Sequence, residues 1–544
     1  MRKRFWHLLV VVGLLAWSPS LLSRDRRPGK RQSTATPGFR TSDRCLACHN
    51  GLTTPSGEDI SIGFDWRSSM MANSSRDPYW QGSVRRESMD HPESKAAIED
   101  ECSICHMPIS HLQAKWKGTK SEVFSHLPLD PENKGDAGAA DGVSCSVCHQ
   151  IGKEKLGTRE SFNGGFVVDQ PASNDDHPEY GPFDVSRGHQ RIMRTATGMF
   201  RPTGAGHIRD SALCGTCHTL LTTALGKGGQ EIGSLPEQMP YLEWLHSDYP
   251  NRSSCQSCHM PEVHGDVAIT AVLGVPRAGM RRHEFVAANF LVLRMLNLYR
   301  SDLRVVALPS ELTAAVEKTV AFLQSQSARL SIRKVDRTSG ILRADVFVEN
   351  LTGHKLPTAY PSRRAWLHVV VRDGNERKVF ESGALHADGS IEGNRNDADP
   401  ARFEPHYREI TRSDQVQIFE PILGDAGGRV TTGLLTAVRY LKDNRLLPSG
   451  FHKQTAEKDI AVVGEAADDP NFTDAGSLVR YSVPVGDAQG PFHVQAELWY
   501  QPIGFRWAHN LNPYDAVEPH RFVQYYESMA SSSAVVLARA EARQ

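Results

Sequence analysis

The sequence predicts two domains of different class: a mainly α-helical and irregular N-terminal domain, and an all-β, β-sandwich-like C-terminal domain. All ten cysteines lie in five repeats of one pentapeptide between residues 45 and 259. Gly, Pro and Ser punctuate the same region, which favours loops and short helices over long regular elements. Beyond about residue 328, apolar and polar residues alternate as they do in half-buried strands. A chain of 544 residues is also long enough for more than one domain.

The five repeats share the pattern C-x-x-C-H, which is the attachment signature of c-type haem. The two thiols add to the vinyl groups of the porphyrin, and the histidine becomes the proximal ligand of the iron. We therefore expect five covalently attached haem c groups. The attachment residues are Cys45, Cys48, Cys102, Cys105, Cys145, Cys148, Cys214, Cys217, Cys255 and Cys258, and the proximal ligands are His49, His106, His149, His218 and His259.

Two structural roles of the cysteines are the alternatives to haem. A zinc ribbon takes four ligands from two C-x-x-C units, so five units cannot be paired, and a following His is not required. Disulfides within C-x-x-C would close very short loops and would constrain the unfolded chain little. The sequence therefore favours haem over both.

The N-terminus has the order of a secretory signal. Arg2, Lys3 and Arg4 precede an apolar run at residues 8–17, and Ser18-Pro19-Ser20 follows. The run has roughly ten residues, whereas a membrane-spanning helix needs about twenty. We expect residues 1–23 to be a signal peptide and the rest of the chain to be periplasmic. The basic stretch 24–27 is unusual for a mature N-terminus, so an uncleaved anchor and a membrane tether stay open.

The apolar periodicity sets the expected boundaries. Residues 40–305 form the pentahaem cytochrome c domain, 306–328 a connecting helix and 329–544 the β-sandwich-like domain. A helical period covers residues 284–298 and resumes from about Pro309. A period of two then marks strands at 330–332, 344–348, 367–371 and 494–500, with turns at 373–375 and 388–389.

The overall charge excludes one class of partner. With 62 basic and 63 acidic residues, the chain has no sequence-wide basic field for nucleic acid. The strand-rich part contains no G-x-S-x-G, H-E-x-x-H or glycine-rich phosphate loop. Chemistry is therefore expected at the haem groups.

Several segments resemble the multihaem cytochromes c of the cytochrome c-552/c-554 kind, which are common in periplasmic respiratory chains. The resemblance covers about residues 42–300 and is thin after 380. Members often carry a His at the position of Met70-Met71. No motif here ends in Lys, the mark of the nitrite-reducing relatives, so that activity is not expected. The segments are 66–70, 77–80, 213–220, 241–244, 254–261 and 283–285 with Asn289, and, for the C-terminal domain of related cytochromes, 350–358.

The second axial ligands decide what the haem groups do. A haem iron with two protein ligands transfers electrons, whereas one with an open position can bind a small molecule. His283 is the first candidate, because it matches the His-x-Phe of the family. His207 lies in a Gly-flanked loop shortly before Cys214, and His354 lies between Gly353 and Pro357. A thioether from Met70, Met71 or Met193 is the alternative.

Three functions remain open. The first is a carrier of electrons between redox partners, namely a quinol-oxidising membrane module and a terminal reductase or conduit. The second is an oxidoreductase that acts on a small nitrogen or sulfur compound at one five-coordinate haem. The third is a subunit of an extracellular or outer-membrane electron conduit. The missing Lys-type motif and the 23 histidines favour the carrier. The sequence leaves the oligomeric state open.

Overall fold

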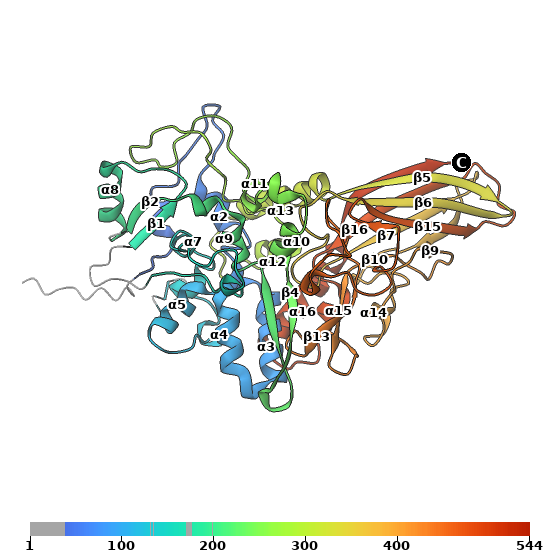
Figure 1. The fold of residues 1–544 in the computed structure, drawn as a ribbon, viewed down its shortest axis with the longest axis horizontal. Coiled ribbons are helices and arrows are strands. Elements are labelled where there is room, and N and C mark those ends of the chain that lie inside the picture. Colours follow the sequence, from blue (N-terminus) through green and yellow to red (C-terminus); the bar gives the residue numbers. More distant parts are fainter. Residues whose placement is uncertain (1–37, 131, 134, 170–176, 199) are drawn as a thin grey trace, which may run out of the picture. The chain divides into compact units, whose positions relative to one another are not determined.

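The five C-x-x-C-H motifs lie in a helical and irregular region, and antiparallel sheets dominate the C-terminal region (Figure 1). The computed structural model describes residues 38–544 except 131, 134, 170–176 and 199. Within it, Pro37–Gln544 form one compact unit. The expected signal peptide at 1–23 lies outside the described residues. The predicted fold class is thus confirmed.

Short helices and two small sheets build the motif-bearing region. The strands β1 and β2 pair in parallel, and β3 and β4 form an antiparallel hairpin. The elements are α1 (Asp43–Leu46), α2 (Ile62–Arg67), α3 (Pro78–Asp90), α4 (Lys95–His106), α5 (Pro108–Trp116), α6 (Ala137–Ala140), α7 (Cys145–Cys148), β1 (His177–Gly181), α8 (Arg187–Thr197), β2 (Phe200–Gly204), α9 (Ser211–Gly215), β3 (Leu220–Leu225), β4 (Glu231–Gln238), α10 (Pro240–Leu245) and α11 (Cys255–His259).

Two helices follow the last motif, α12 (Phe290–Leu298) and α13 (Pro309–Gln326). The first begins later than the apolar period from residue 284 predicts. The carbonyl of Val286 accepts a hydrogen bond from the His259 ring, and Phe285 has a left-handed φ of 48°. These residues therefore run irregularly past the motifs, and Asn289 caps the helix by accepting from the Val292 N–H.

Two five-stranded sheets form most of the C-terminal region. One has the order β10-β7-β16-β17 with β8 beside β7, and the other has the order β14-β15-β6-β5 with β9 beside β15. A third sheet has the order β12-β11-β13. The strands are β5 (Ala328–Thr338), β6 (Ile341–Asn350), β7 (Arg364–Arg372), β8 (Lys378–Ser382), β9 (Glu409–Ile410), β10 (Ile418–Phe419), β11 (Pro421–Asp425), β12 (Val430–Thr431), β13 (Ala437–Asp443), β14 (Phe472–Thr473), β15 (Gly476–Pro484), β16 (His493–Gln501) and β17 (Val535–Arg543), with α14 (Arg395–Ala398), α15 (Phe505–His509) and α16 (Val517–Met529) between them.

The alternation predicted from the sequence places one face of each large sheet in the core. Every second residue of β6 and of β16 is buried. The buried residues Val346 and Val348 belong to the same apolar cluster as Val494 and Leu498 from the other sheet. Two sheets that share one apolar interior in this way pack as in a β-sandwich.

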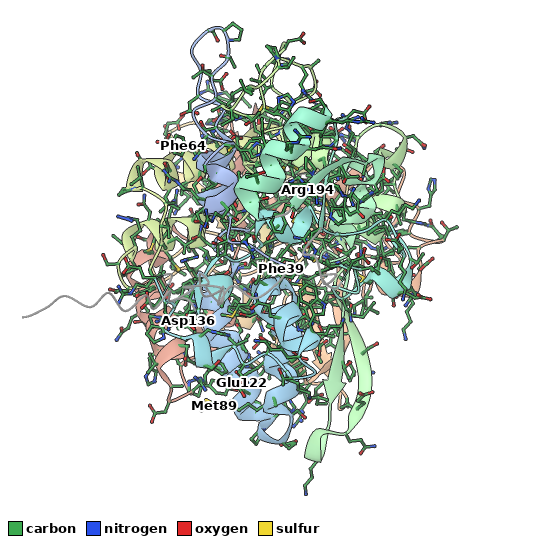
Figure 2. The ribbon with its side chains drawn as sticks, turned by 90° about the vertical axis from the view of Figure 1, so that its left-hand side faces the viewer. Phe39, Phe64, Met89, Glu122, Asp136 and Arg194 are labelled. Carbon is green, nitrogen blue, oxygen red and sulfur yellow. The ribbon has the colours of Figure 1, made fainter. Side chains whose placement is uncertain are left out.

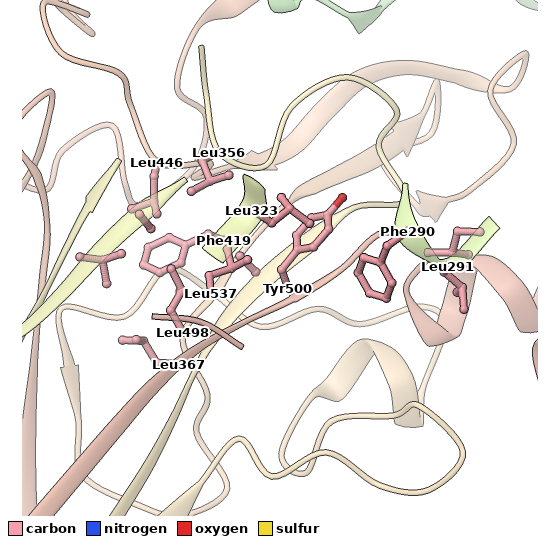
Figure 3. Close-up of a cluster of buried hydrophobic side chains, with 14 of the residues drawn as sticks. Phe290, Leu291, Leu323, Leu356, Leu367, Phe419, Leu446, Leu498, Tyr500 and Leu537 are labelled. Atoms are coloured by element: carbon pink, nitrogen blue, oxygen red, sulfur yellow. The ribbon is translucent and has the colours of Figure 1, made fainter. Parts of the chain in front are cut away.

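The same apolar cluster continues into the helices that follow the last motif. Phe290 and Leu291 of α12 and Leu323 of α13 lie in it with the strand residues, as Figure 3 shows. The Phe290 and Tyr500 ring centroids are 6.3 Å apart. The side chains on both sides of the expected boundary near residue 305 are therefore packed against each other.

Polar contacts join the two regions as well. The helix α3 packs against α16, where Arg85 makes a two-pronged ion pair with Glu518 at 2.8 and 3.0 Å. Glu243 of α10 pairs with Arg445 at 3.0 Å, and Arg445 pairs with Asp443 of β13 at 2.8 Å. These three groups are buried, so each charge has its partner where water is excluded.

In the part of the chain that the structure describes, no helix has both the length and the apolar character needed to cross a membrane.

Candidate haem sites

Each C-x-x-C-H motif coincides with a helical turn. The motifs overlap α1, α9 and α11, lie at the end of α4, or form α7. On a helix, residues three apart lie on one face, so both cysteines of a motif point in the same direction. No disulfide uses any of the ten thiols. The local structure therefore presents each thiol pair for attachment to a single group.

Four of the five motif histidines are held by backbone carbonyls. The Nδ1–H of His49 donates to the Ile269 carbonyl at 2.6 Å, and that of His106 donates to Ser74 at 2.9 Å. The corresponding acceptor for His149 is Tyr180 at 2.5 Å, and for His259 it is Val286 at 2.6 Å. A metal-ligating imidazole commonly donates its second N–H in this way, which fixes the tautomer and leaves Nε2 for the metal.

The motif imidazoles are in environments that keep them neutral. Burial lowers the pKa of His106 and of His218 to about 4, and it also lowers the pKa values of His49, His149 and His259. The His218 ring lies deep in the protein, and the part of its surface that is accessible faces an internal cavity. An imidazole must be unprotonated at the ligating nitrogen to bind a metal. The donor set therefore fits haem iron.

His149 and His283 face each other. Their ring centroids are 6.4 Å apart and their planes are inclined by 22°. A metal–imidazole bond is about 2 Å long and a ring nitrogen lies about 1 Å from its centroid, so two imidazoles on opposite sides of one metal have centroids about 6 Å apart. His283 also donates its Nδ1–H to the Arg281 carbonyl at 3.1 Å. Burial lowers its pKa to about 3.

His259 and His354 form a second pair with the same geometry. Their centroids are 6.3 Å apart and their planes are inclined by 10°. His354 donates its Nδ1–H to the Lys355 carbonyl at 3.0 Å, and burial lowers its pKa to about 4. His354 lies between β6 and β7, so the strand-rich region contributes one ring of this pair.

The remaining candidate, His207, has other contacts. Its Nε2–H donates to the Ile151 carbonyl at 2.9 Å, and its ring meets that of Tyr180 edge-on at a centroid distance of 4.8 Å. Neither contact joins it to a motif histidine. The structure thus brings two of the three predicted distal histidines against motif imidazoles and places His207 against the carbonyl of Ile151, two residues after motif three.

The rings of His49, His106 and His218 are not paired with another imidazole among the residues that the structure describes. His106 stacks on Trp80 with a centroid distance of 4.3 Å and an interplanar angle of 4°. The thioether candidates line the same cavity as these three histidines; they are Met70, Met71 and Met193.

The motifs surround one continuous cavity. Cysteines and histidines of the first four motifs line it, and Gln256 and Met260 bring the fifth motif to its wall. Thiols of different motifs lie close enough for one to shift the pKa of the other in three places. These contacts join Cys45 to Cys145, Cys105 to Cys217 and Cys214 to Cys255. Motifs one and three, two and four, and four and five are therefore direct neighbours.

The sequence did not reveal the groups that orient the motif histidines. The acceptors on Ile269, Ser74, Tyr180 and Val286 are backbone carbonyls, and any residue type supplies one. Only the fold brings them to the rings. Trp80 stacks on His106. It belongs to segment 77–80, which carried the family resemblance, and that resemblance could have indicated from the sequence that Trp80 lies at a motif.

No family model and no curated protein matches the chain. Among solved structures, the fold is similar to that of a penta-haem cytochrome c552 from Thermochromatium tepidum. The TM-score is 0.52 at 16% sequence identity, and the match covers 94% of this chain and 100% of that one. The chain thus has the fold of a multihaem cytochrome.

Proposed function

We propose that the protein is a periplasmic pentahaem c-type cytochrome that carries electrons between redox partners in a respiratory chain. The observation that carries this proposal is the arrangement of its five attachment motifs around one cavity. When bound, haem c supplies a one-electron couple between ferric and ferrous iron. The protein's own residues fix where each such group is attached.

The thiol contacts give the order of neighbours. Motif four adjoins motif two through Cys217 and Cys105, and it adjoins motif five through Cys214 and Cys255. Cys217 also contributes to the raised pKa of Cys148, so motif three lies near motif four. Cys45 and Cys145 connect motif one to motif three. Attachment sites in an unbroken series of contacts are what an electron carrier needs.

The paired imidazoles support two protein ligands, one on each side of the iron, at two of the five sites. We assign His283 as the second ligand opposite His149, and His354 as the second ligand opposite His259, on the ring separations of 6.4 and 6.3 Å. Two protein ligands hold an iron for electron transfer, because a small molecule must displace one of them to bind. A role of His207 as the second ligand at a further site stays a proposal.

The partners follow from this role. A quinol-oxidising membrane module is the proposed donor, and a terminal reductase or an electron conduit is the proposed acceptor. The expected N-terminal signal supports export, and c-type haem is attached on the exported side of the membrane. Export through that signal, with or without a retained anchor, belongs to the same proposal.

Haem content and redox titration test the proposed function. A pyridine haemochrome assay with intact-protein mass spectrometry should give five haem groups per chain. A spectro-electrochemical titration should then show all of them accepting electrons reversibly. A protein with three or fewer groups, or with groups that do not reduce reversibly, would contradict it.

A second candidate function has its own observation. The cavity wall carries the polar side chains of Asp77, Tyr79, Tyr360 and Arg363, and Arg363 contributes to the lowered pKa of His218. In the described part of the chain no other imidazole stacks on or faces the His218 ring. The second candidate function is reduction of a small nitrogen or sulfur compound at a haem whose iron has His218 as its one protein ligand. Polar side chains on the cavity wall would bind such a compound. A high-spin ferric signal in low-temperature EPR of the oxidised protein would favour it.

A further inference from the structure

The wall beside motif one combines an apolar inner face with a basic outer face. Helix α8 presents His189, Ile192, Met193 and Ala196 to the cavity. These residues recur at helical spacing, so they lie on one side of the helix. Arg187 and Arg191 lie on the other side; both are exposed and neither lines the cavity. One helix thus separates the haem cavity from solvent.

A loop at residues 269–277 extends this wall. Val272 and Val275 line the cavity, whereas Leu273 between them points to solvent with 71% of its surface exposed. Its φ of 51° is in the left-handed region, which a leucine adopts at a cost. The loop therefore exposes Leu273 most, and Val272 and Val275 beside it keep 39% and 55% of their surfaces exposed.

Hydrogen bonds tie this loop to motif one. The Cys48 carbonyl accepts from the Ala271 N–H at 2.8 Å and from the Thr270 hydroxyl at 3.2 Å. The Ile269 carbonyl accepts from the His49 ring at 2.6 Å. The loop therefore lies directly on the motif, and a group attached at Cys45 and Cys48 is close to the outer surface here.

The loop and α8 are also joined to each other. His189 donates from Nε2 to the Leu273 carbonyl at 2.8 Å. The guanidinium groups of Arg209 and Arg277 lie over the Phe183 ring at 5.6 and 5.0 Å from its centroid. We name this surface the basic face; it consists of Arg187, Arg191, Arg209, Val272, Leu273 and Val275. Figure 2 looks onto α8, on which Arg194 is labelled.

The basic face differs from the rest of the chain in charge. Residues 185–209 contain five arginines and no acidic residue, with Asp184 and Asp210 at the two ends, whereas the whole chain has a net charge of −1. Among the residues that the structure describes, Arg187 and Arg191 have no acidic side chain within salt-bridge distance. Arg194 and Arg201 have partners, so the exposed charges of Arg187 and Arg191 are the ones that attract a partner of opposite charge.

From these observations, and resting on the proposed function, we propose that the basic face is the docking surface of a small acidic electron-transfer protein. The arginines steer the acidic partner, and the exposed Leu273 with its valine neighbours provides the apolar contact. Electron-transfer encounters bury small interfaces and depend on electrostatic steering for their rate. Tunnelling rates fall steeply with distance, so a wall one helix thick favours exchange at motif one.

The test uses the haem-loaded full-length protein and a reduced acidic [2Fe–2S] ferredoxin as the probe. Stopped-flow mixing at low ionic strength gives the second-order rate constant for electron transfer. The double variant Arg187→Glu/Arg191→Glu should lower this constant about tenfold or more, because steering contributes about 10–10³-fold to association rates. The difference should vanish at about 1 M salt, where the Debye length is about 3 Å. Leu273→Ser should lower the constant at both ionic strengths.

The matched control is Lys117→Glu/Lys120→Glu, which makes the same change in net charge at two exposed lysines after α5. It should leave the rate within about twofold of the parent. Equal losses in the two double variants would overturn the docking surface, because net charge alone would then explain them. An unchanged ferredoxin rate in Arg187→Glu/Arg191→Glu would also overturn it. If that variant then lost binding to vesicles of anionic phospholipid, the face would be a membrane contact instead. Reduction by dithionite tests the proposed function separately and should be the same in every variant.

Discussion

The His259 and His354 rings lie almost parallel at a centroid distance of 6.3 Å, although the two residues are 95 positions apart in the chain. Each ring donates its Nδ1–H to a backbone carbonyl, that of Val286 for His259 and that of Lys355 for His354. Both therefore present Nε2 as the nitrogen without a backbone acceptor. The strand-rich region thus contributes one ring of a pair whose other ring belongs to the last attachment motif.

The variant His354→Ala tests this pair. It should keep the full haem count, because both thioether bonds and His259 remain, but about one haem in five should become high-spin. A low-spin iron with two imidazoles loses one strong ligand, which also raises its reduction potential. EPR of the oxidised form and carbon monoxide binding to the reduced form measure this change.

The control for that experiment is His386→Ala, which removes a half-exposed histidine of the strand-rich region that pairs with Glu392. It should leave the EPR spectrum unchanged. A purely low-spin spectrum in His354→Ala would show that His354 does not bind iron.

The variant His283→Ala makes the same test at the third motif, where the His149 ring is 6.4 Å away. It should also give one high-spin haem, and the double variant with His354→Ala should give two, since the two pairs are separate. If His283→Ala keeps the parent spectrum while His207→Ala changes it, the assignment of His283 is wrong. Low-temperature EPR with spin quantitation distinguishes the outcomes.

The sequence predicted the class of both regions, because haem-attachment motifs and alternating strands are local patterns. It placed strands around residues 330–332, 344–348, 367–371 and 494–500, and β5, β6, β7 and β16 cover them. The β3–β4 hairpin was missed, because it lies among Gly-rich segments that favour loops. The start of α12 was also missed, since the Val286 carbonyl bonds to the His259 ring, which the local pattern does not encode.

The candidate site was predictable to a similar extent. The motif residues are contiguous in sequence, so a haem-attachment role could be predicted for them directly. The neighbours of each motif could not, because the contacts of Cys45 with Cys145 and of Cys105 with Cys217 skip one motif along the chain. The series of contacts therefore does not follow chain order, and only the fold determines it.

Glu237 predicts a pH dependence of stability. Burial raises its pKa to about 7, although Thr222 and Gln238 donate hydrogen bonds to its two oxygens. An unfolded Glu titrates near 4.3, so between about pH 4.5 and 7 the folded state binds more protons than the unfolded state. The free energy of unfolding therefore falls as the pH rises through this range. In the Glu237→Gln variant, the decrease in the free energy of unfolding across this pH range should be smaller by roughly 2–3 kcal/mol at most.

Urea unfolding at several pH values between 4.5 and 8 measures the slope, so any pH-independent cost of the substitution cancels. The control is Glu527→Gln, which changes an exposed carboxylate of α16. It should reproduce the slope of the parent protein. A Glu237→Gln slope equal to that of the control would mean that Glu237 ionises normally in the folded protein.

Phe290 predicts how unfolding of the two regions is coupled. Its side chain is fully buried and packs against Tyr500, in the apolar cluster that includes both large sheets. Phe290→Ala should lower the free energy of unfolding by about 3–5 kcal/mol, the usual cost of emptying a buried phenylalanine site. Since the cluster is continuous, haem absorbance and far-UV circular dichroism should shift together to a lower denaturant midpoint.

The control is Leu308→Ala, because the Leu308 side chain just before α13 is 50% exposed. An exposed substitution changes stability by about 0.5 kcal/mol or less, so both midpoints should stay near those of the parent. Two separate transitions in Phe290→Ala, with the haem signal lost first, would show that the strand-rich region is stable without the motif-bearing region. A single shifted transition would show that packing between Phe290 and Tyr500 makes the two regions one cooperative unit.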